Sequence, residues 1–233
     1  MNNYEKLEGM VAATFTPLDE NGDVNLSVID KYADWIASTP IKGVFVCGTT
    51  GEFSSLTIDE RKLILEKWLV SARKRFKVIA HVGSNCQRSA MELARHAAQV
   101  GADAIASIAP SFFKPGTVDE LVDFFAPICH SAAGLPFYYY NMPSITGVNL
   151  PVDKFLVEGK KKIPNLVGTK FTHNNLMEMG VCIELEQHRF EVLHGYDEIL
   201  ISGLAMGAVA GVGSTYNYIP NVYQAIFDSM KMN

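Results

Sequence analysis

The sequence is poor in cysteine, with four in 233 residues, and it contains no Cys-x-x-Cys pair. Cys47, Cys86, Cys129 and Cys182 lie far apart, which argues against a disulfide framework and against a structural zinc site. The first residues also lack the apolar stretch of a secretory signal peptide. We therefore expect a reducing, cytoplasmic location.

An excess of positive charge is absent as well. The 20 Lys and Arg residues are outnumbered by 25 Asp and Glu, and no helix face is basic, so nothing indicates a nucleic-acid partner. We interpret the one basic cluster, Lys160-Lys161-Lys162, as a solvated loop. The stretch from Ile199 to Phe227 has no charged residue and is long enough to span a membrane. Glycines and polar residues interrupt it, so we expect a buried helix, a buried strand and a second helix, with no membrane partner.

The sequence does contain a repeated strand–helix rhythm. Most apolar runs are continuous, which is typical of parallel strands covered on both faces. Capping boxes at Thr57 and Thr117 start two of the intervening helices, and residues 88–99 and 177–186 are expected to form others. The strand-length runs begin near Gly9, Gly43, Lys77, Ala104, Pro136, Leu166, Phe190 and Ala210.

Eight such units without a linker predict a single (β/α)8 barrel domain over residues 1–233. A doubly wound open sheet is the alternative, and it favours a glycine-rich turn after the first strand. The corresponding segment, residues 14–18, contains no glycine, so a dinucleotide site is poorly supported. In a barrel the active site lies at the C-terminal ends of the strands, which directs attention to the residues there.

Lys170 lies near the end of the predicted sixth strand, residues 166–171. Burial disfavours the charged form of an amine, so a desolvated lysine at a strand end is a candidate Schiff-base nucleophile. By strand alternation it shares a face with Gly168 and Leu166, and we expect the small Gly168 to leave room inside the barrel. The alternative is a lysine whose amine reaches solvent.

Tyr140 ends the preceding strand and is the natural partner of Lys170. Adjacent strands lie about 4.8 Å apart, so two inward side chains can share one substrate. Phe137 and Tyr139 then face the helices. Across the mouth, the turn containing Thr49 and Thr50 offers hydroxyl and N–H groups that can hold a carboxylate, although a simple glycine-permitted turn explains the same residues.

Two further possibilities concern the other strand ends. His81 and His194 are best interpreted as hydrogen-bonded core or rim histidines, because the first strand lacks the His-x-His pair of metal-dependent hydrolase barrels. Glycines at the seventh and eighth strand ends, including Gly195, leave a phosphosugar site open. Asp197 and Glu198 argue against it, because carboxylates repel a phosphate dianion.

Taken together, these segments resemble the N-acetylneuraminate lyase / dihydrodipicolinate synthase family of Schiff-base aldolases, from about Leu7 to about Tyr218. Within the family the chain is most similar to the animal form of the lyase branch, because Ile145 stands where the synthase branch has an arginine. Phe113 replaces a tyrosine that reaches a neighbouring subunit in several relatives. The matching segments are residues 48–52, 140–143, 168–170, 195–198 and 211–217.

The resemblance implies a chemistry and a set of roles. Lys170 forms a Schiff base with the C2 ketone of N-acetylneuraminate, Tyr140 moves protons, and Thr49 and Thr50 hold the carboxylate. The products are N-acetylmannosamine and pyruvate, no metal or organic cofactor is implied, and the family assembles as a homotetramer. The residues implied to hold the polyol and N-acetyl end are Thr172, Gly195, Asp197, Glu198, Gly213 and Ser214.

The resemblance also leads us to expect further helices after the barrel, which the sequence up to Asn233 does not contain. Two alternatives to the active lyase therefore remain. One is a truncated, weakly active or inactive variant that acts by associating with full-length subunits. The other is an aldolase of the same chemistry that uses another 2-keto acid.

Overall fold

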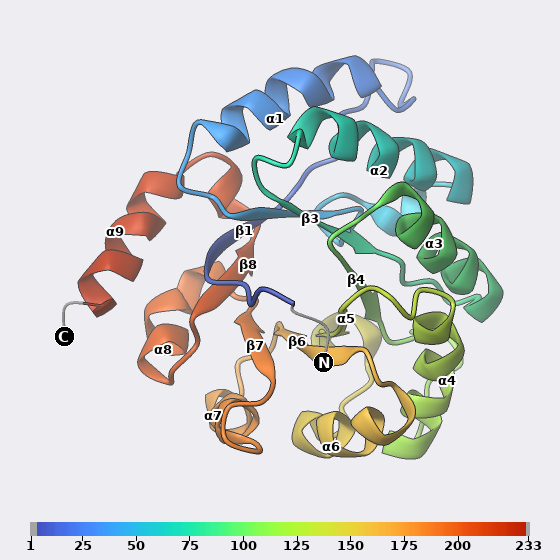
Figure 1. Ribbon diagram of the computed structural model, residues 1–233, viewed down its shortest axis with the longest axis vertical. Coiled ribbons are helices and arrows are strands. Elements are labelled where there is room, and N and C mark those ends of the chain that lie inside the picture. The colour runs from blue at the N-terminus through green and yellow to red at the C-terminus, as the bar shows by residue number, and fades with distance from the viewer. Residues whose placement is uncertain (1–3, 232–233) are drawn as a thin grey trace.

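The computed structural model describes residues 4–231, which form a closed barrel of eight parallel strands in sequence order, with helices around it (Figure 1). The predicted (β/α)8 fold is confirmed. The strands are β1 (Gly9–Ala13), β2 (Gly43–Val46), β3 (Lys77–His81), β4 (Ala104–Ile108), β5 (Phe137–Asn141), β6 (Leu166–Phe171), β7 (Glu191–His194) and β8 (Ala210–Gly213).

Apart from the short α5, the helices surround the barrel, and α4 packs directly against α6. Both predicted capping boxes are present, at Thr57 and Thr117. Within the described residues no helix has the length and hydrophobicity needed to cross a bilayer. The helices are α1 (Ile29–Ala37), α2 (Ile58–Ala72), α3 (Gln87–Val100), α4 (Val118–His130), α5 (Pro143–Thr146), α6 (Val152–Lys162), α7 (Leu176–Glu184), α8 (Leu200–Ala205) and α9 (Pro220–Lys231).

One prediction about a loop was wrong. Lys160, Lys161 and Lys162 form the last turn of α6, where cations interact favourably with the carbonyl end of a helix. The Lys160 amine donates to the backbone oxygens of Pro164 at 2.6 Å and Leu166 at 2.8 Å. The cluster therefore ends a helix, and Lys160 ties that helix to the start of β6.

The strand β6 contains an irregularity that the sequence pattern did not reveal. Its pairing with β5 shifts register between Phe137 and Tyr138, so that Phe137 pairs with Leu166 and Tyr138 pairs with Gly168. Because of this extra residue, Leu166 packs outside among the helices, whereas Lys170 faces the barrel interior. The expectation that Leu166 and Lys170 share a face was therefore wrong.

Gly168 has a different role from the expected one. A side-chain carbon at this position would overlap the backbone oxygen of Glu191 on β7. The residue is thus small because two strand backbones approach each other closely beside the bulge, and not in order to leave space for Lys170.

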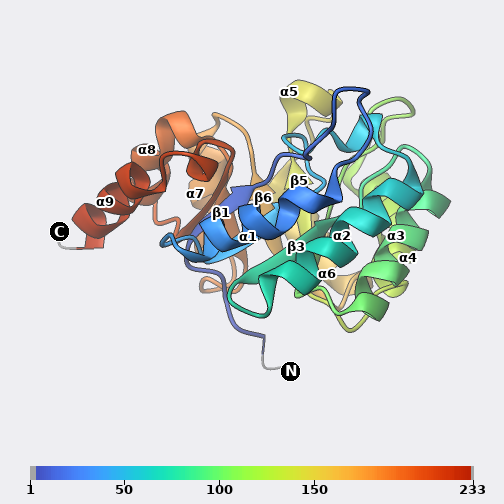
Figure 2. The same ribbon diagram turned by 90° about the horizontal axis from the view of Figure 1, so that it is seen from above.

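The N-terminal end of the barrel is closed by a buried polar group, which we call the floor: Glu191, Tyr138, Tyr4 and Leu7. The Glu191 carboxylate accepts hydrogen bonds from the Leu7 N–H at 2.8 Å and the Tyr138 hydroxyl at 3.2 Å. Tyr4 and Tyr138 share a further hydrogen bond through their hydroxyls. Figure 2 shows the N-terminal segment leaving the barrel at the end opposite α5.

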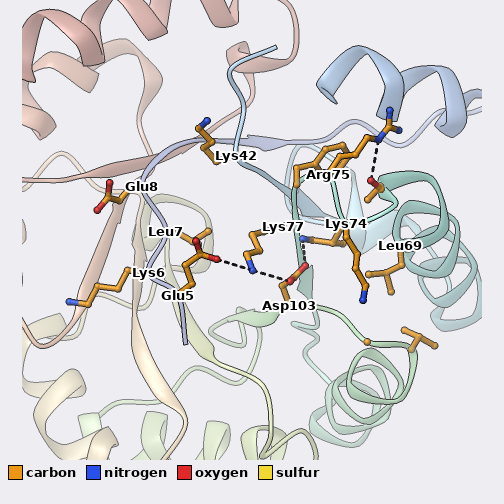
Figure 3. A pocket seen from close by; sticks show the side chains of 15 residues that line it. Glu5, Lys6, Leu7, Glu8, Lys42, Leu69, Lys74, Arg75, Lys77 and Asp103 are labelled. Carbon is orange, nitrogen blue, oxygen red and sulfur yellow. Dashed lines mark hydrogen bonds and ion pairs between the residues drawn. The ribbon is translucent and has the colours of Figure 1, made fainter. Parts of the chain in front are cut away.

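A groove of about 1120 Å³ lies beside this N-terminal segment (Figure 3). Lys77 lies between Glu5 and Asp103 and forms ion pairs with them at 3.3 Å and 3.6 Å. The groove is therefore at the opposite end of the strands from Lys170 and Tyr140, and its charges are partly neutralised within the chain.

Candidate active site

Lys170 and Tyr140 meet inside the C-terminal half of the barrel, as predicted. The two residues are paired across β5 and β6, and only 4% of Lys170 is exposed. The Lys170 Nζ atom lies 4.1 Å from the centroid of the Tyr140 ring and 4.3 Å from that of Phe45. We call Lys170, Tyr140, Phe45 and Thr49 the mouth group.

The Lys170 amine is positioned by packing alone. Within residues 4–231 its Nζ atom makes no hydrogen bond or ion pair, and its close neighbours are the two aromatic faces. Such faces attract an ammonium ion but do not accept a conventional hydrogen bond from it. The amine is therefore held among aromatic rings while its nitrogen stays open to an incoming carbonyl group.

The Tyr140 hydroxyl takes part in a short hydrogen-bonded chain. It lies 3.1 Å from Thr49 Oγ1 and 3.1 Å from the Met142 sulfur. A thioether can only accept a hydrogen bond, so the Met142 sulfur accepts from Tyr140 and, at 3.9 Å, from the Thr49 hydroxyl. The sequence analysis expected Thr49 to be near this site, but it missed Met142 although this residue lies inside the matched segment 140–143.

The turn that carries Thr49 and Thr50 is fixed by unusual backbone geometry. Cys47 and Glu52, on either side of it, both adopt positive φ, 54° and 55°, a conformation that is uncommon outside glycine. A side-chain carbon at Gly48 would come within 2.8 Å of the Phe45 ring. Thr49 is exposed and contacts Tyr140, whereas the Thr50 side chain is half-buried and forms no hydrogen bond within the described chain.

On the opposite side of the mouth, Thr172 and Gly195 pack directly against each other. Thr172 is buried, and in the described part of the chain its Oγ1 atom has no hydrogen-bond partner. A side-chain carbon at Gly195 would overlap this oxygen. A buried hydroxyl without a partner is costly, so Thr172 offers an unused donor and acceptor at the end of β6.

Asp197 is buried at the end of β7, and its carboxylate is already engaged. It accepts hydrogen bonds from the Thr215 N–H at 2.8 Å and the Thr215 hydroxyl at 2.6 Å. A side-chain carbon at Gly213 would overlap the Asp197 carboxylate, which explains a glycine there. Glu198 is exposed and Ser214 is half-buried. Thr215 lies in the matched segment 211–217 but was not predicted as a site residue.

The two candidate histidines are core residues, as we predicted. His81 faces the barrel interior beside Tyr140, with ring centroids 5.8 Å apart, and its Nδ1 lies 2.8 Å from the Cys47 carbonyl oxygen. Burial, reinforced by the positive charge of Arg61, holds the pKa of His81 well below its usual value. His194 lies against Gly203 and Met179 on the helix side, and burial lowers its pKa too.

Arg61 fixes the strand end beneath His81. From α2 it donates to the backbone oxygens of His81 at 2.7 Å and Gly83 at 2.9 Å, and burial lowers its pKa to about 10.

Over residues 4–231, no three His, Cys, Asp or Glu side chains gather in a way that could hold a metal ion.

Comparison with known proteins identifies the family of this chain. Residues 6–232 match the dihydrodipicolinate synthetase family. The chain belongs to this family. Human N-acetylneuraminate lyase is 45% identical over 218 residues, which span 92% of this chain and 68% of the human protein.

Solved structures give the same family. N-acetylneuraminate lyase from Proteus mirabilis has a TM-score of 0.95 and 37% identity, and the match covers 98% of this chain and 77% of that one. A catalytic lysine mutant of the sialic acid aldolase from Ruminococcus gnavus has a TM-score of 0.92 and 29% identity, covering 100% and 76%. The family resemblance read from the five sequence segments is thus confirmed.

Proposed function

We propose that the chain is a class I aldolase that cleaves N-acetylneuraminate to N-acetylmannosamine and pyruvate. The observation that carries the proposal is the buried Lys170 amine, which has no hydrogen-bond partner in the described chain and lies beside the ring of Tyr140. Similarity to N-acetylneuraminate lyases from several vertebrates supports the choice of substrate.

Lys170 is the proposed nucleophile. Its amine attacks the C2 ketone of the open-chain sugar acid, and loss of water gives an iminium ion. The iminium draws the electron pair of the C3–C4 bond as that bond breaks, while the C4 hydroxyl loses its proton and N-acetylmannosamine departs. The remaining enamine takes a proton at C3, and hydrolysis of the iminium releases pyruvate and restores the lysine.

Tyr140 is the proposed proton carrier. It lies at the C-terminal end of the barrel beside the Lys170 amine, and its hydroxyl is oriented by Thr49 and Met142. Thr49 and Thr50 would hold the substrate carboxylate at the mouth. A positioned acid–base group of this kind contributes typically 10²–10⁴-fold to a rate.

The remainder of the sugar acid would bind along the ends of β6, β7 and β8. The Thr172 hydroxyl supplies an unused hydrogen-bonding group there, and Asp197 fixes Thr215 at the end of β8. These positions suit a neutral polyol better than a phosphate, because the exposed Glu198 and buried Asp197 carboxylates would repel a dianion. The proposed polyol and N-acetyl contacts are Thr172, Gly195, Asp197, Glu198, Gly213 and Ser214.

Trapping of the Schiff base tests the nucleophile. The protein is incubated with pyruvate and borohydride, and the modified peptide is identified by mass spectrometry. We expect one reduced pyruvate adduct, at Lys170, which is absent in Lys170→Met and retained in the control Lys42→Met. A folded wild-type protein without an adduct would exclude the aldolase.

Cleavage assays then test the substrate. Release of pyruvate from N-acetylneuraminate is compared with release from other 2-keto sugar acids. We expect N-acetylneuraminate to have the highest kcat/KM. A clear preference for another 2-keto acid would contradict the proposed substrate but would leave the proposed Schiff-base chemistry standing.

We also propose a homotetramer in the cytoplasm. The family resemblance supports the assembly, and the exposed Phe112 and Phe113 at the β4–α4 loop, whose rings meet edge to face, offer apolar surface for contact with another copy. The free thiols of all four cysteines suit a reducing compartment. Light scattering and cell fractionation test the two statements, and a monomer or a membrane-bound fraction would contradict them.

A further inference from the structure

Met142 occupies a rigid position at the junction of β5 and α5. Its backbone oxygen accepts hydrogen bonds from the Thr146 N–H and the Thr146 hydroxyl, each at 3.1 Å. On its other side, the Asn141 carbonyl accepts from the Thr172 N–H at 2.8 Å. The chain is thus fixed before and after Met142, which limits where its side chain can reach.

The Met142 sulfur is held close to the proton of Tyr140. The hydroxyl donates to it at 3.1 Å, and Thr49 Oγ1 lies 3.9 Å away. A thioether is a weak acceptor, so this bond orients the O–H without binding it strongly. A leucine of similar volume would fill the same space but would leave the direction of the O–H to Thr49 alone.

Met142 is half-buried at the mouth, so part of the residue is open to solvent and to small solutes. Hydrogen peroxide can transfer one oxygen atom to it, which gives a sulfoxide and water. The change converts an apolar side chain into a polar one and is reversed by methionine sulfoxide reductases. The new S=O oxygen is a much stronger acceptor for the Tyr140 proton than the thioether.

From this geometry we propose that Met142 is a positioning residue for Tyr140, and that peroxide oxidation of its thioether slows the reaction. The inference rests on the proposed aldolase function and adds to it. Oxidation leaves Lys170 unchanged, so formation of the Schiff base with pyruvate continues while proton transfer by Tyr140 is impaired.

The first test replaces the thioether. In Met142→Leu we expect kcat to fall about tenfold, a part of the usual contribution of a positioned proton carrier, with KM changed by less than about twofold. The pyruvate adduct at Lys170 should form as in the wild type. A kcat within about twofold of wild type would overturn the positioning role.

The matched control is Met177→Leu, because Met177 is 82% exposed on α7 and contacts neither Tyr140 nor Lys170. It should keep the wild-type kcat. Thermal melting of each variant shows that it is folded. If Met142→Leu fails to fold, the oxidation experiment on the wild type decides the question.

The second test oxidises the proteins with hydrogen peroxide and then adds a thiol reductant, which restores oxidised cysteines such as the exposed Cys86 but leaves a sulfoxide in place. Wild type and Met177→Leu should lose activity in parallel with sulfoxide at Met142, and a methionine sulfoxide reductase should restore it. Met142→Leu should lose no further activity. Equal losses in wild type and Met142→Leu would overturn the oxidative switch.

Met142→Gln provides an independent check, because its amide oxygen places a strong acceptor near the same position. It should behave like the oxidised wild type and should not respond to peroxide. Full wild-type activity in Met142→Gln would contradict the inference. Failure of the wild type to form any pyruvate adduct would instead contradict the proposed function itself.

Discussion

The barrel buries an ionisable group beside tyrosines at each end, but it treats the two groups differently. At the floor, the Glu191 carboxylate accepts hydrogen bonds from Leu7 and Tyr138. In the mouth group, the Lys170 amine lies over the faces of Phe45 and Tyr140 and, among the described residues, makes no hydrogen bond or ion pair. The hydrogen bonds of Glu191 are all made within the protein, whereas the nitrogen of Lys170 remains available to a substrate. The comparison therefore separates a structural group from a chemical one.

The largest effect is expected from Lys170→Met. Loss of the nucleophile should reduce N-acetylneuraminate cleavage by roughly 10⁴-fold or more. Stability should stay the same or increase, because an apolar side chain replaces a buried amine without a polar partner. Steady-state kinetics and denaturant unfolding measure the two quantities. A large loss of stability would show that Lys170 contributes to the free energy of unfolding as the floor residues do.

Tyr140→Phe should have the next largest effect. It retains the ring beside the lysine and removes only the hydroxyl, so kcat should fall by about 10²–10⁴-fold while the pyruvate adduct at Lys170 still forms. Cleavage rates and adduct mass spectrometry distinguish the two steps. Loss of the adduct together with the rate would mean that the hydroxyl is needed already for Schiff-base formation.

At the floor we expect a loss of stability with little loss of activity. Glu191→Leu leaves the Leu7 N–H and the Tyr138 hydroxyl without their acceptor, which should cost about 1–3 kcal/mol of unfolding free energy. The kcat of the folded fraction should remain within about twofold of wild type. Urea unfolding and kinetics below the transition test this prediction, and a large fall in kcat would remove the distinction between the two ends.

The smallest effect concerns pH. Burial raises the pKa of Glu191 above its ordinary value of 4.5, so the folded protein binds this proton more tightly than the unfolded chain. The resulting stability is fully present below 4.5 and is lost as the pH rises through the folded-state pKa. Relative to Glu191→Gln, wild type should therefore gain in Tm between about pH 7 and about pH 5. An unchanged difference would mean that Glu191 is not desolvated.

Much of this arrangement could be predicted from the sequence. Continuous apolar runs gave the strand positions, and the capping boxes at Thr57 and Thr117 gave two helix starts. Because neighbouring strands in a barrel are consecutive, the pairing of Tyr140 with Lys170 followed from the order of the motifs. The exposure of Glu198 and the engagement of Asp197 could not be predicted, since they depend on side-chain directions.

The missed residues have separate physical causes. Phe45 and Met142 are apolar, and an apolar residue in or next to an apolar strand carries no sign that it touches a reacting group. Thr215 is polar, but its partner Asp197 comes from another strand end. Leu166 was placed on the wrong face because period-two alternation assumes an unbroken ladder, and the bulge beside Gly168 breaks it.

That bulge has a consequence for how the reactive pair depends on the backbone. It changes which alternate residues of β6 face inward, so that Leu166 packs among the helices whereas Lys170, four residues later, faces the lumen. In an unbroken ladder, Val167 would pair with Tyr138 while Leu166 still faced outward. Lys170 would then also face outward, and its amine would lie among the helices. The barrel wall would separate it from the phenol of Tyr140. A single additional peptide unit thus determines on which side of that wall the lysine lies.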